Sequence, residues 1–461
     1  MDTSFVCIGF LFILSFLFVN GVSQSTVRFL PGLDGPLPFE LETGYVSIDD
    51  SRGVELFYYF FKSENNPSKD PLLIWFTGGP GCSGLSAILF ESGPFKLKIE
   101  EYNGSLPNLE LNKYSWTKVS NIVYIDAPVG TGFSYATEGS HPNDNTAGKD
   151  DYTFIRKWLT QHPQYITNSL YIGGDSYSGK IVPITALAIS DGIEVGDKPL
   201  INFKGYLLGN PITDRTIEIN HLIQYAYGMG LLSYELFQSI KRNCEEEYVN
   251  FDPTNLKCIS DIQDVDKCIN GIFDQHILEP KSCVQKVQLT SDERSREENS
   301  RNSLFFPTPK TPECETYGYM LSYYWANNIE VQDALNIRKD IDKEWLRCNQ
   351  FGINFTYTTE RLTIGYHLTI SKKNYRSLIY SGDQDMAVPY SSTQAWIRSL
   401  KYPVEDKWRP WTVEGQVAGY TTKYSNNMTF ATVKGAGHIA IESKKKESLA
   451  MFKRWLSYEP L

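Results

Sequence analysis

One stretch of the chain surrounds a serine with small residues directly after an apolar segment. Residues 169–183 read SLYIGGDSYSGKIVP, in which Gly174 lies two positions before Ser176 and Ser178-Gly179 follow two and three positions after it. A nucleophilic serine needs small neighbours, because it sits on a sharp strand-to-helix turn where backbone passes close to backbone. The pattern G-x-S-x-S-G therefore indicates a nucleophile, with an ordinary structural turn as the alternative.

Two kinds of nucleotide-binding loop are disfavoured at the same place. A P-loop has the pattern G-x-x-x-x-G-K-[ST], which Gly174, Gly179 and Lys180 match. Ile181 occupies the Ser/Thr position, so magnesium would lack its hydroxyl ligand. The dinucleotide pattern G-x-G-x-x-G is absent from this stretch. A nucleophilic serine is the better prediction.

A serine nucleophile needs a general base, and the chain has six histidines. His438 alone follows a strand-like segment through a small-residue loop, KGAGH, which would let its ring reach over the edge of a sheet. His141 and His162 precede the serine and are each followed by proline, as is typical of loops, and the other three lie in polar stretches that we expect to be irregular. We predict that His438 is the base, with a buried structural histidine as the alternative.

The base in turn needs an acid that orients it, and one known chain order for such triads is serine, acid, histidine. The segment LIYSGDQD ends with Asp383 and Asp385. We predict Asp385 as the acid. Asp383 is the competing candidate, although a turn residue that accepts backbone hydrogen bonds would also explain it.

An acyl-transfer reaction also needs donors for the oxyanion of its tetrahedral intermediate. One donor is predicted to be the N–H of Tyr177, which directly follows the nucleophile. The second is expected from a glycine-rich loop after an earlier strand, and TGGPG, with Gly79 as the best candidate, supplies such a loop.

The elements that must position these residues alternate along the chain. Apolar strand-like runs occur near residues 72–76, 121–125, 169–174, 201–211, 375–385 and 428–438, with helix-like spacing at 150–159 and 179–192. GYVSIDD and VELFYYFFKS flank residues 51–53 as a predicted hairpin. This alternation predicts an α/β fold with a mostly parallel central sheet and helices on both faces. From Thr213 to about Pro312 the chain is polar and cysteine-rich, which we interpret as an insertion over the sheet.

Composition and the N-terminus limit the possible partners and compartments. The net charge of −10 and the lack of a basic stripe argue against a nucleic-acid partner. Residues 1–23 are predicted to be a secretory signal peptide, although Asp2 and the lack of Lys or Arg depart from the usual pattern and a membrane anchor is the alternative. No later segment has 18 unbroken apolar residues, so we expect a mature protein, residues 24–461, that is not held in a membrane.

Cysteines and sequons agree with passage through the secretory route. Seven cysteines follow the predicted signal peptide, and their spacing fits no zinc pattern, so disulfides are expected and an odd thiol is left over. Three Asn-x-Ser/Thr triplets begin at Asn103, Asn354 and Asn427 and are predicted to carry glycans.

Several motifs, taken together and in order, resemble one family. The chain is similar to plant serine carboxypeptidase-like proteins of peptidase family S10 through WFTGGPGCSG, ESGPF, IDAPVGTGFSY, GGDSYSGK, GNPITD, YSGDQDMAVP and GAGHIA. The resemblance implies an α/β-hydrolase fold with a cap inserted at about residues 213–315, the triad Ser176, Asp385 and His438, and an oxyanion hole at Gly79 and Tyr177. It also implies the disulfides Cys82–Cys348, Cys244–Cys258 and Cys283–Cys314, which leave Cys268 unpaired. An exposed charged loop at 290–303 falls where some members are cut into two chains.

Two departures from the family bear on the substrate. Family carboxypeptidases grip the free C-terminal carboxylate of a peptide, and this chain retains the matching Trp75 and Glu91. Thr77 stands in the position of an Asn, however, and Asp175 in the position of a Glu. Because a threonine hydroxyl is shorter than an amide and aspartate is one methylene shorter than glutamate, the carboxylate grip is predicted to be weaker or aimed elsewhere. Similar changes accompany the use of sugar esters in the plant acyltransferases of the family.

We therefore predict a secreted or vacuolar enzyme that forms an acyl-enzyme on Ser176, with a lean towards an acyltransferase that uses glucose-ester donors. The alternatives are a serine carboxypeptidase active at acidic pH, a non-catalytic binding protein on the same fold and, more weakly, a nucleotide-binding protein. The expected partner is a small acyl ester or a peptide. No metal or organic cofactor is implied, and oligomeric state is not predicted.

Overall fold

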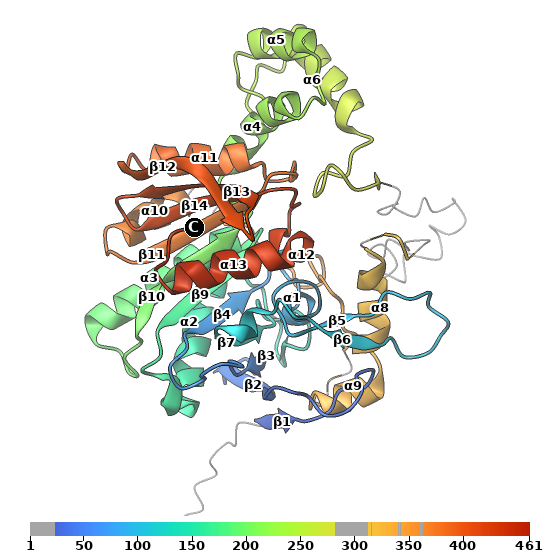
Figure 1. Ribbon diagram of the computed structural model, residues 1–461, viewed down its shortest axis with the longest axis vertical. Helices are drawn as coiled ribbons and strands as arrows, with labels where there is room; N and C mark the ends of the chain where they lie inside the picture. Colours follow the sequence, from blue (N-terminus) through green and yellow to red (C-terminus); the bar gives the residue numbers. More distant parts are fainter. Residues whose placement is uncertain (1–23, 282–311, 315, 340, 342, 359–362) are drawn as a thin grey trace, which may run out of the picture.

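The computed structural model describes residues 24–281, 312–314, 316–339, 341, 343–358 and 363–461. The predicted signal peptide at 1–23, Cys283 and the charged loop at 290–303 lie outside the described residues. The described chain folds around a twelve-stranded sheet of strand order β1-β2-β3-β7-β4-β9-β10-β11-β14-β13-β12, with β8 paired to β3 (Figure 1).

Parallel strands form the middle of this sheet. They are β7 (Asn121–Ile125), β4 (Leu72–Phe76), β9 (Leu170–Asp175), β10 (Phe203–Gly209), β11 (Arg376–Gly382) and β14 (Met428–Val433). Every one of these strands lies in an apolar run that the sequence singled out, because a parallel strand buried on both faces is apolar along its whole length. The predicted mostly parallel sheet is confirmed.

Antiparallel strands close both sides of the sheet. On one side are β1 (Ser25–Val27), β2 (Leu41–Asp49), β3 (Val54–Phe61) and β8 (Tyr135–Ala136), which include the predicted hairpin β2–β3. On the other side are β12 (Val404–Val413) and β13 (Gln416–Tyr424), which the sequence did not predict. Only Trp411 of the ten residues of β12 is buried, so this edge strand lacks the apolar pattern that reveals a strand.

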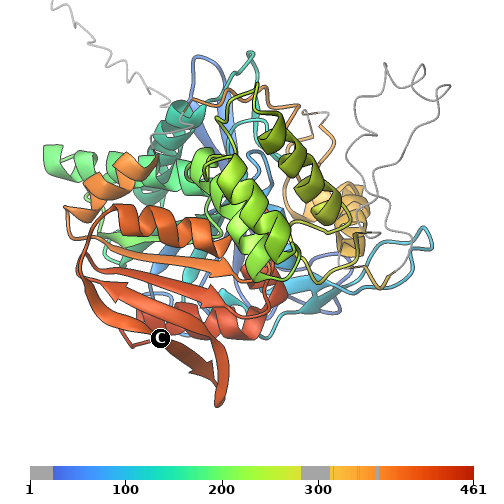
Figure 2. The same cartoon turned by 90° about the horizontal axis from the view of Figure 1, so that it is seen from above.

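Helices cover both faces of the sheet, as predicted (Figures 1 and 2). The reason is visible in β3, where Phe57, Tyr59 and Phe61 pack into one core and Tyr58 and Phe60 into the other, since successive side chains of a strand point to opposite faces. One core is completed by α1 (Gly84–Phe90), α8 (Tyr317–Ala326), α9 (Ile329–Ala334), α12 (Ala440–Ser443) and α13 (Lys445–Leu456). The other is completed by α2 (Asp144–Gln161), α3 (Ser178–Val195), α10 (Thr363–Ser371) and α11 (Tyr390–Ser399).

Helix α2 is longer than the helix predicted at 150–159. Its first turns are marked by a polar capping sequence and not by the apolar spacing on which the prediction relied. The side chain of Asn143 accepts hydrogen bonds from the N–H groups of Asn145 and Thr146, and the Thr146 hydroxyl bonds back to the N–H of Asn143. This reciprocal cap starts the helix six residues before the first predicted one.

Three helices follow β10 and stand away from the sheet (Figure 1). They are α4 (Arg215–Gly228), α5 (Tyr234–Asn243) and α6 (Leu256–Ile269), and they bury a small apolar core of their own. The disulfide Cys244–Cys258 joins α5 to α6 within that core. Figure 2, which looks down on this end of the molecule, shows the three helices in front of the other elements. They lie within the segment 213–315 that was predicted to be a cap.

Smaller elements complete the description. Strands β5 (Phe95–Leu97) and β6 (Leu109–Leu111) form a separate two-stranded sheet, and single 3-10 turns span Trp116–Lys118 and Pro163–Tyr165. Within the described residues, no helix is both long and apolar enough to cross a bilayer. The carboxyl ends of the parallel strands meet at one edge of the central sheet, which is where open α/β sheets bind their ligands.

Candidate active site

Ser176 occupies the sharp turn between β9 and α3. Its backbone has a φ of 51°, a left-handed conformation that is costly for serine and typical of strained functional positions. A Cβ on Gly174 would collide with the carbonyl of Phe76, and one on Gly179 would lie 2.6 Å from the carbonyl of Ile212. The small residues that flank the serine are therefore required by close backbone approach.

The structure brings the three predicted triad residues together. The imidazole of His438 lies with Nε2 2.8 Å from Ser176 Oγ and Nδ1 2.8 Å from Asp385 Oδ2. Asp385 is fully buried and His438 is 8% exposed. A hydrogen on Nδ1, donated to the carboxylate, leaves Nε2 free to accept the serine proton, which is the arrangement a general base needs.

The electrostatics of His438 reflect two opposing effects. Burial acts to lower its pKa, but the charge of Asp385, the hydrogen bond to it and the charge of Asp175 outweigh burial, so the pKa of His438 lies above its ordinary value of 6.5. The ring therefore gains a proton readily, and the resulting imidazolium is stabilised by the carboxylate beside it.

Asp385 is itself fixed by three donors. Its Oδ1 accepts hydrogen bonds from the N–H groups of Ala387 at 2.9 Å and Val388 at 3.1 Å, and its Oδ2 accepts one from the Asn210 amide at 2.7 Å. The competing candidate, Asp383, accepts instead from the N–H of Gly435 at 2.7 Å, which is the turn role considered for it.

Asn210 was missed by the sequence reasoning. It lies directly after β10 with a φ of 41°, it is fully buried, and its Oδ1 accepts a hydrogen bond from the N–H of Gly382 at 3.1 Å. The motif GNPITD carried the signal, because an asparagine after a strand at the carboxyl edge of a sheet can bridge neighbouring loops.

The TGGPG loop packs against the nucleophile. A Cβ on Gly78 would lie 2.8 Å from Ser176 Cβ and 3.1 Å from the backbone nitrogen of Tyr177, so only glycine allows this approach. The N–H of Gly78 donates to Asp175 Oδ1 at 2.9 Å, and the carbonyl of Gly79 accepts from the Gln350 side chain at 2.9 Å. The predicted oxyanion residues, Gly79 and Tyr177, thus sit on two segments that touch at Ser176.

The four residues predicted to bind substrate include Asp175, which directly precedes the nucleophile. Trp75, Thr77, Glu91 and Asp175 are all buried, with 0, 8, 3 and 2% of each residue exposed. Each has a buried polar atom that lacks a hydrogen-bond partner in the described part of the chain: Trp75 Nε1, Thr77 Oγ1, Glu91 Oε2 and Asp175 Oδ2. Because buried polar groups are normally paired, these unpaired atoms are candidates to bind a polar ligand.

Burial shifts the carboxyl groups of this cluster towards the protonated form. It raises the pKa of Asp175 to about 6. Burial, together with the charges of Asp175 and Glu442, raises the pKa of Glu91 well above its ordinary 4.5. The pKa of Glu442 is raised by burial as well, although the charges of Lys445 and Arg347 act against that rise.

Two members of this cluster escaped the sequence reasoning. Glu442 lies in α12, and its Oε2 accepts a hydrogen bond from the Tyr319 hydroxyl at 2.9 Å. Tyr380 lies in β11 with its hydroxyl buried and unpaired among the described residues, and burial raises its pKa, with the charges of Asp175 and Glu91 adding to the rise. No motif pointed to either residue, because they reach the cluster only through the packing of β11 and α12.

One disulfide adjoins the TGGPG loop and another lies within the helices that follow β10. Cys82, directly after TGGPG, is bonded to Cys348, and Cys244 is bonded to Cys258. Cys314 is also disulfide-bonded, while its expected partner Cys283 lies outside the described residues. Cys268 is free and exposed. Several disulfides in one chain fit an oxidising, extracytoplasmic compartment.

Comparison with known proteins agrees with this geometry. The serine carboxypeptidase family model matches residues 31–458. The chain is 48% identical to serine carboxypeptidase-like 19 of Arabidopsis thaliana over 98% of each chain, and 47% identical to serine carboxypeptidase-like 2 of the same plant over 95% of this chain and 94% of that one.

Among solved structures, a prohormone-processing carboxypeptidase from Saccharomyces cerevisiae superposes with a TM-score of 0.72 at 20% identity, covering 94% of this chain and 95% of that one. That likeness shows the α/β-hydrolase fold. The extent of the family match and the identity to the plant proteins show that this chain belongs to the serine carboxypeptidase family, as a hydrolase or acyltransferase of the serine carboxypeptidase-like type.

Proposed function

We propose that this protein is a secreted enzyme that transfers acyl groups from glucose esters to an alcohol or amine through an acyl-enzyme on Ser176. The observation that carries the acyl-enzyme step of the proposal is the continuous hydrogen-bond chain from Ser176 Oγ through His438 to Asp385, with both contacts at 2.8 Å. A chain of this kind is what a serine needs to become a nucleophile.

In the proposed reaction, Ser176 Oγ attacks the acyl carbonyl and its proton passes to His438 Nε2. The N–H groups of Gly79 and Tyr177 stabilise the oxyanion, each contributing about 3 kcal/mol in comparable sites. The bond to the leaving group then breaks, and His438 returns the proton to the departing glucose oxygen. An acceptor hydroxyl or amine gives its proton to His438 and attacks the acyl carbonyl, the bond between that carbon and Ser176 Oγ breaks, and His438 returns the proton to Ser176 Oγ.

The preference for an ester over a peptide rests on the carboxyl cluster. A peptide's C-terminal carboxylate beside Glu91 and Asp175 would need at least one of them protonated, because like charges at close range are repulsive. Burial raises the pKa of Asp175 to about 6, so above this pH the condition depends on Glu91 alone, whose pKa burial also raises. A glucose leaving group carries hydroxyls that can donate to an ionised carboxylate, so it needs no such proton.

Two reactions separate these substrates. Purified protein is incubated with a blocked dipeptide and, separately, with a phenolic glucose ester and an alcohol acceptor, each at pH 5 and pH 7.5. We expect acyl transfer from the ester at both values and little release of amino acid. Rapid release of a C-terminal amino acid would overturn the acyltransferase proposal and favour the carboxypeptidase. Failure of the protein to react with a fluorophosphonate at either pH would favour a non-catalytic binding protein.

A matched pair of variants tests the two departures directly. The double variant Thr77→Asn, Asp175→Glu restores the side chains that family carboxypeptidases use, and we expect its ratio of peptide hydrolysis to ester transfer to rise about tenfold, the effect of roughly 1.4 kcal/mol. Asp175→Asn removes the charge without changing the length and should leave that ratio low at pH 5. An unchanged ratio in the double variant would mean that these positions do not select the substrate.

Two further parts of the proposal concern the N-terminal segment and the insertion after β10. We propose that residues 1–23 direct secretion or vacuolar delivery and are removed, and that 213–315 form a cap over the carboxyl edge of the sheet. N-terminal sequencing of the purified protein is expected to begin near residue 24. A chain that still begins with Met1 would contradict the signal peptide.

A further inference from the structure

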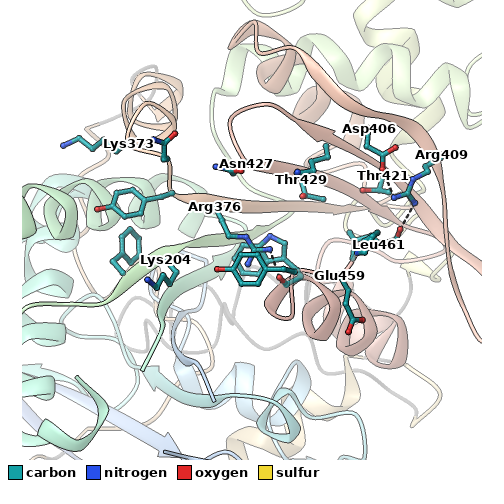
Figure 3. Close-up of a pocket in the computed structure, with 17 residues that line it drawn as sticks. Lys204, Lys373, Arg376, Asp406, Arg409, Thr421, Asn427, Thr429, Glu459 and Leu461 are labelled. Carbon is teal, nitrogen blue, oxygen red and sulfur yellow. Dashed lines mark hydrogen bonds and ion pairs between the residues drawn. The ribbon is translucent and has the colours of Figure 1, made fainter. Parts of the chain in front are cut away.

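A cavity lies at the opposite end of the sheet from Ser176. Its volume is about 600 Å³, within the range of small-ligand pockets, and its wall includes the first residues of β10 and β11 and the start of β14 (Figure 3). The triad residues follow the carboxyl ends of β9, β11 and β14, so the length of β11 alone separates the cavity from the catalytic edge by roughly 20 Å. A ligand in this cavity is therefore not the substrate.

The cavity contains both functional residues of one glycosylation sequon. Asn427 and Thr429 of the triplet Asn-Met-Thr line it together. Asn427 lies in the turn between β13 and β14 with a φ of 61° and is exposed, and its side-chain amide has no hydrogen-bond partner within the described residues. A glycan attached to this amide would begin at the rim of the cavity.

Aromatic and cationic side chains form the opposite wall. The guanidinium of Arg376 lies 4.7 Å from the ring centre of Trp455 and 3.7 Å from that of Tyr458, and it donates to the carbonyl of Trp455 at 2.6 Å. Tyr458 is 67% exposed, which leaves an apolar ring surface facing solvent. Rings next to hydrogen-bonding groups suit a sugar, which presents apolar C–H faces and hydroxyls at the same time.

The charges around the cavity favour a neutral ligand over an anion. Lys373 is paired with Glu194 at 2.6 Å, Lys423 with Glu405 at 2.9 Å and Arg409 with Asp406 at 2.6 Å. The Arg409 guanidinium also donates to the terminal residue, Leu461, at 2.6 Å. Since most of the basic groups are already neutralised, little net positive charge remains to attract a phosphate or sulfate.

We propose that the cavity is the docking site of the protein's own N-linked glycan, attached at Asn427, with its first sugars packed against the exposed ring of Tyr458. The docked sugars connect the β13–β14 turn to the end of α13. They also cover the C-terminal residues. The glycan therefore stabilises this end of the sheet, in contrast to a glycan at Asn103, which lies on an exposed loop whose triplet does not line this cavity.

The first test measures how accessible each glycan is. The full chain is secreted from mammalian cells and digested under native conditions with an amidase that releases N-glycans, and the peptides that contain Asn103 and Asn427 are followed by mass spectrometry. We expect Asn427 to be occupied and its glycan to be released at least about tenfold more slowly than that of Asn103, which corresponds to roughly 1.4 kcal/mol of protection. After denaturation and reduction the two rates should converge. An unoccupied Asn427, or equal native rates, would overturn the proposal.

The second test separates the glycan from the side chains that carry it. Thr429→Val removes the sequon and keeps the shape of the side chain, whereas Thr429→Ser keeps the sequon. We expect Thr429→Val and Asn427→Gln each to lower Tm by about 1–2 °C, the double variant to lower it no further, and Thr429→Ser and Ser105→Ala to leave it unchanged. A loss in Thr429→Val without one in Asn427→Gln would assign the effect to packing and refute the docking. A Tm of the deglycosylated protein that rises with millimolar phosphate would show an anion site instead.

Discussion

Asn210 is expected to matter for catalysis although it touches neither the substrate nor the nucleophile. We consider Asn210→Gly, because glycine tolerates the φ of 41° at this position and the variant therefore removes the amide without adding backbone strain. The change deletes the 2.7 Å hydrogen bond to Asp385 Oδ2. A hydrogen bond to a charged group contributes about 1.5–3 kcal/mol, so kcat/KM should fall by about 10- to 150-fold.

The pH profile gives a readout that a loss of stability would not produce. Asp385 raises the pKa of His438 against the opposing effect of burial, so a less firmly held Asp385 lets that pKa fall. Since the free base is the neutral imidazole, the acidic limb of the kcat/KM profile should move to lower pH in Asn210→Gly. Steady-state kinetics with an activated ester, measured from pH 4 to pH 8, provides both quantities.

A matched control distinguishes positioning from folding. Asn426 is also a buried asparagine, with its amide bonded to Ser371 Oγ at 3.1 Å, but it lies at the amino end of β14, away from the triad. Asn426→Gly should lose stability and keep kcat/KM and the pH profile. The reasoning is refuted if folded Asn210→Gly keeps kcat/KM within twofold of the parent, or if both variants lose activity equally.

Three further variants test the fold around the site. Burial raises the pKa of Glu218 from 4.5 to about 7, so the folded chain holds this proton more tightly than the unfolded chain, and stability is lost as the pH rises from 4.5 through 7. The variant Glu218→Gln should remove ~3 kcal/mol of that loss, measured by urea titrations at pH 5 and pH 8. A pH dependence equal to that of the parent would contradict this. Cys244→Ser removes the disulfide to Cys258 and should lower the local stability of α5 and α6 by about 3 kcal/mol. Backbone amides in these two helices should then exchange hydrogen faster than in the parent, and exchange rates equal to those of the parent would argue against this. Cys268→Ser, at a free exposed thiol, should leave Tm unchanged, and a fall would show that the thiol is bonded in the native protein.

The central sheet was accessible from sequence because its signal is local. β4 is a continuous apolar run followed by a glycine-rich turn, and β9 is an apolar run that leads into Gly173-Gly174, so both strands could be predicted from the local pattern of residues. The edge strand β12 and helix α8 lack so clear a pattern, since their burial depends on which surface they meet after folding. Their positions are decided by tertiary packing, which no single stretch of sequence encodes.

The same distinction applies to the site. Ser176, Asp385 and His438 each follow an apolar strand with a turn of small or polar residues, so they could be named in advance from motif and chain order. The sequence reasoning did not assign the side chains of Asn210 and Tyr380 to the site, because they join it only through the neighbours that β10 and β11 bring to them. Side chains that act through another residue are therefore the ones that sequence reasoning misses.

The most direct test of the account asks which atom of the protein becomes acylated. Purified protein is treated with a fluorophosphonate from pH 4 to pH 8 and the modified peptide is identified by mass spectrometry. The account predicts a single adduct on Ser176, absent from Ser176→Ala, formed at a rate that rises with pH as His438 loses its proton at a pKa above the ordinary histidine value. An adduct on another residue, or undiminished labelling of Ser176→Ala, would contradict it.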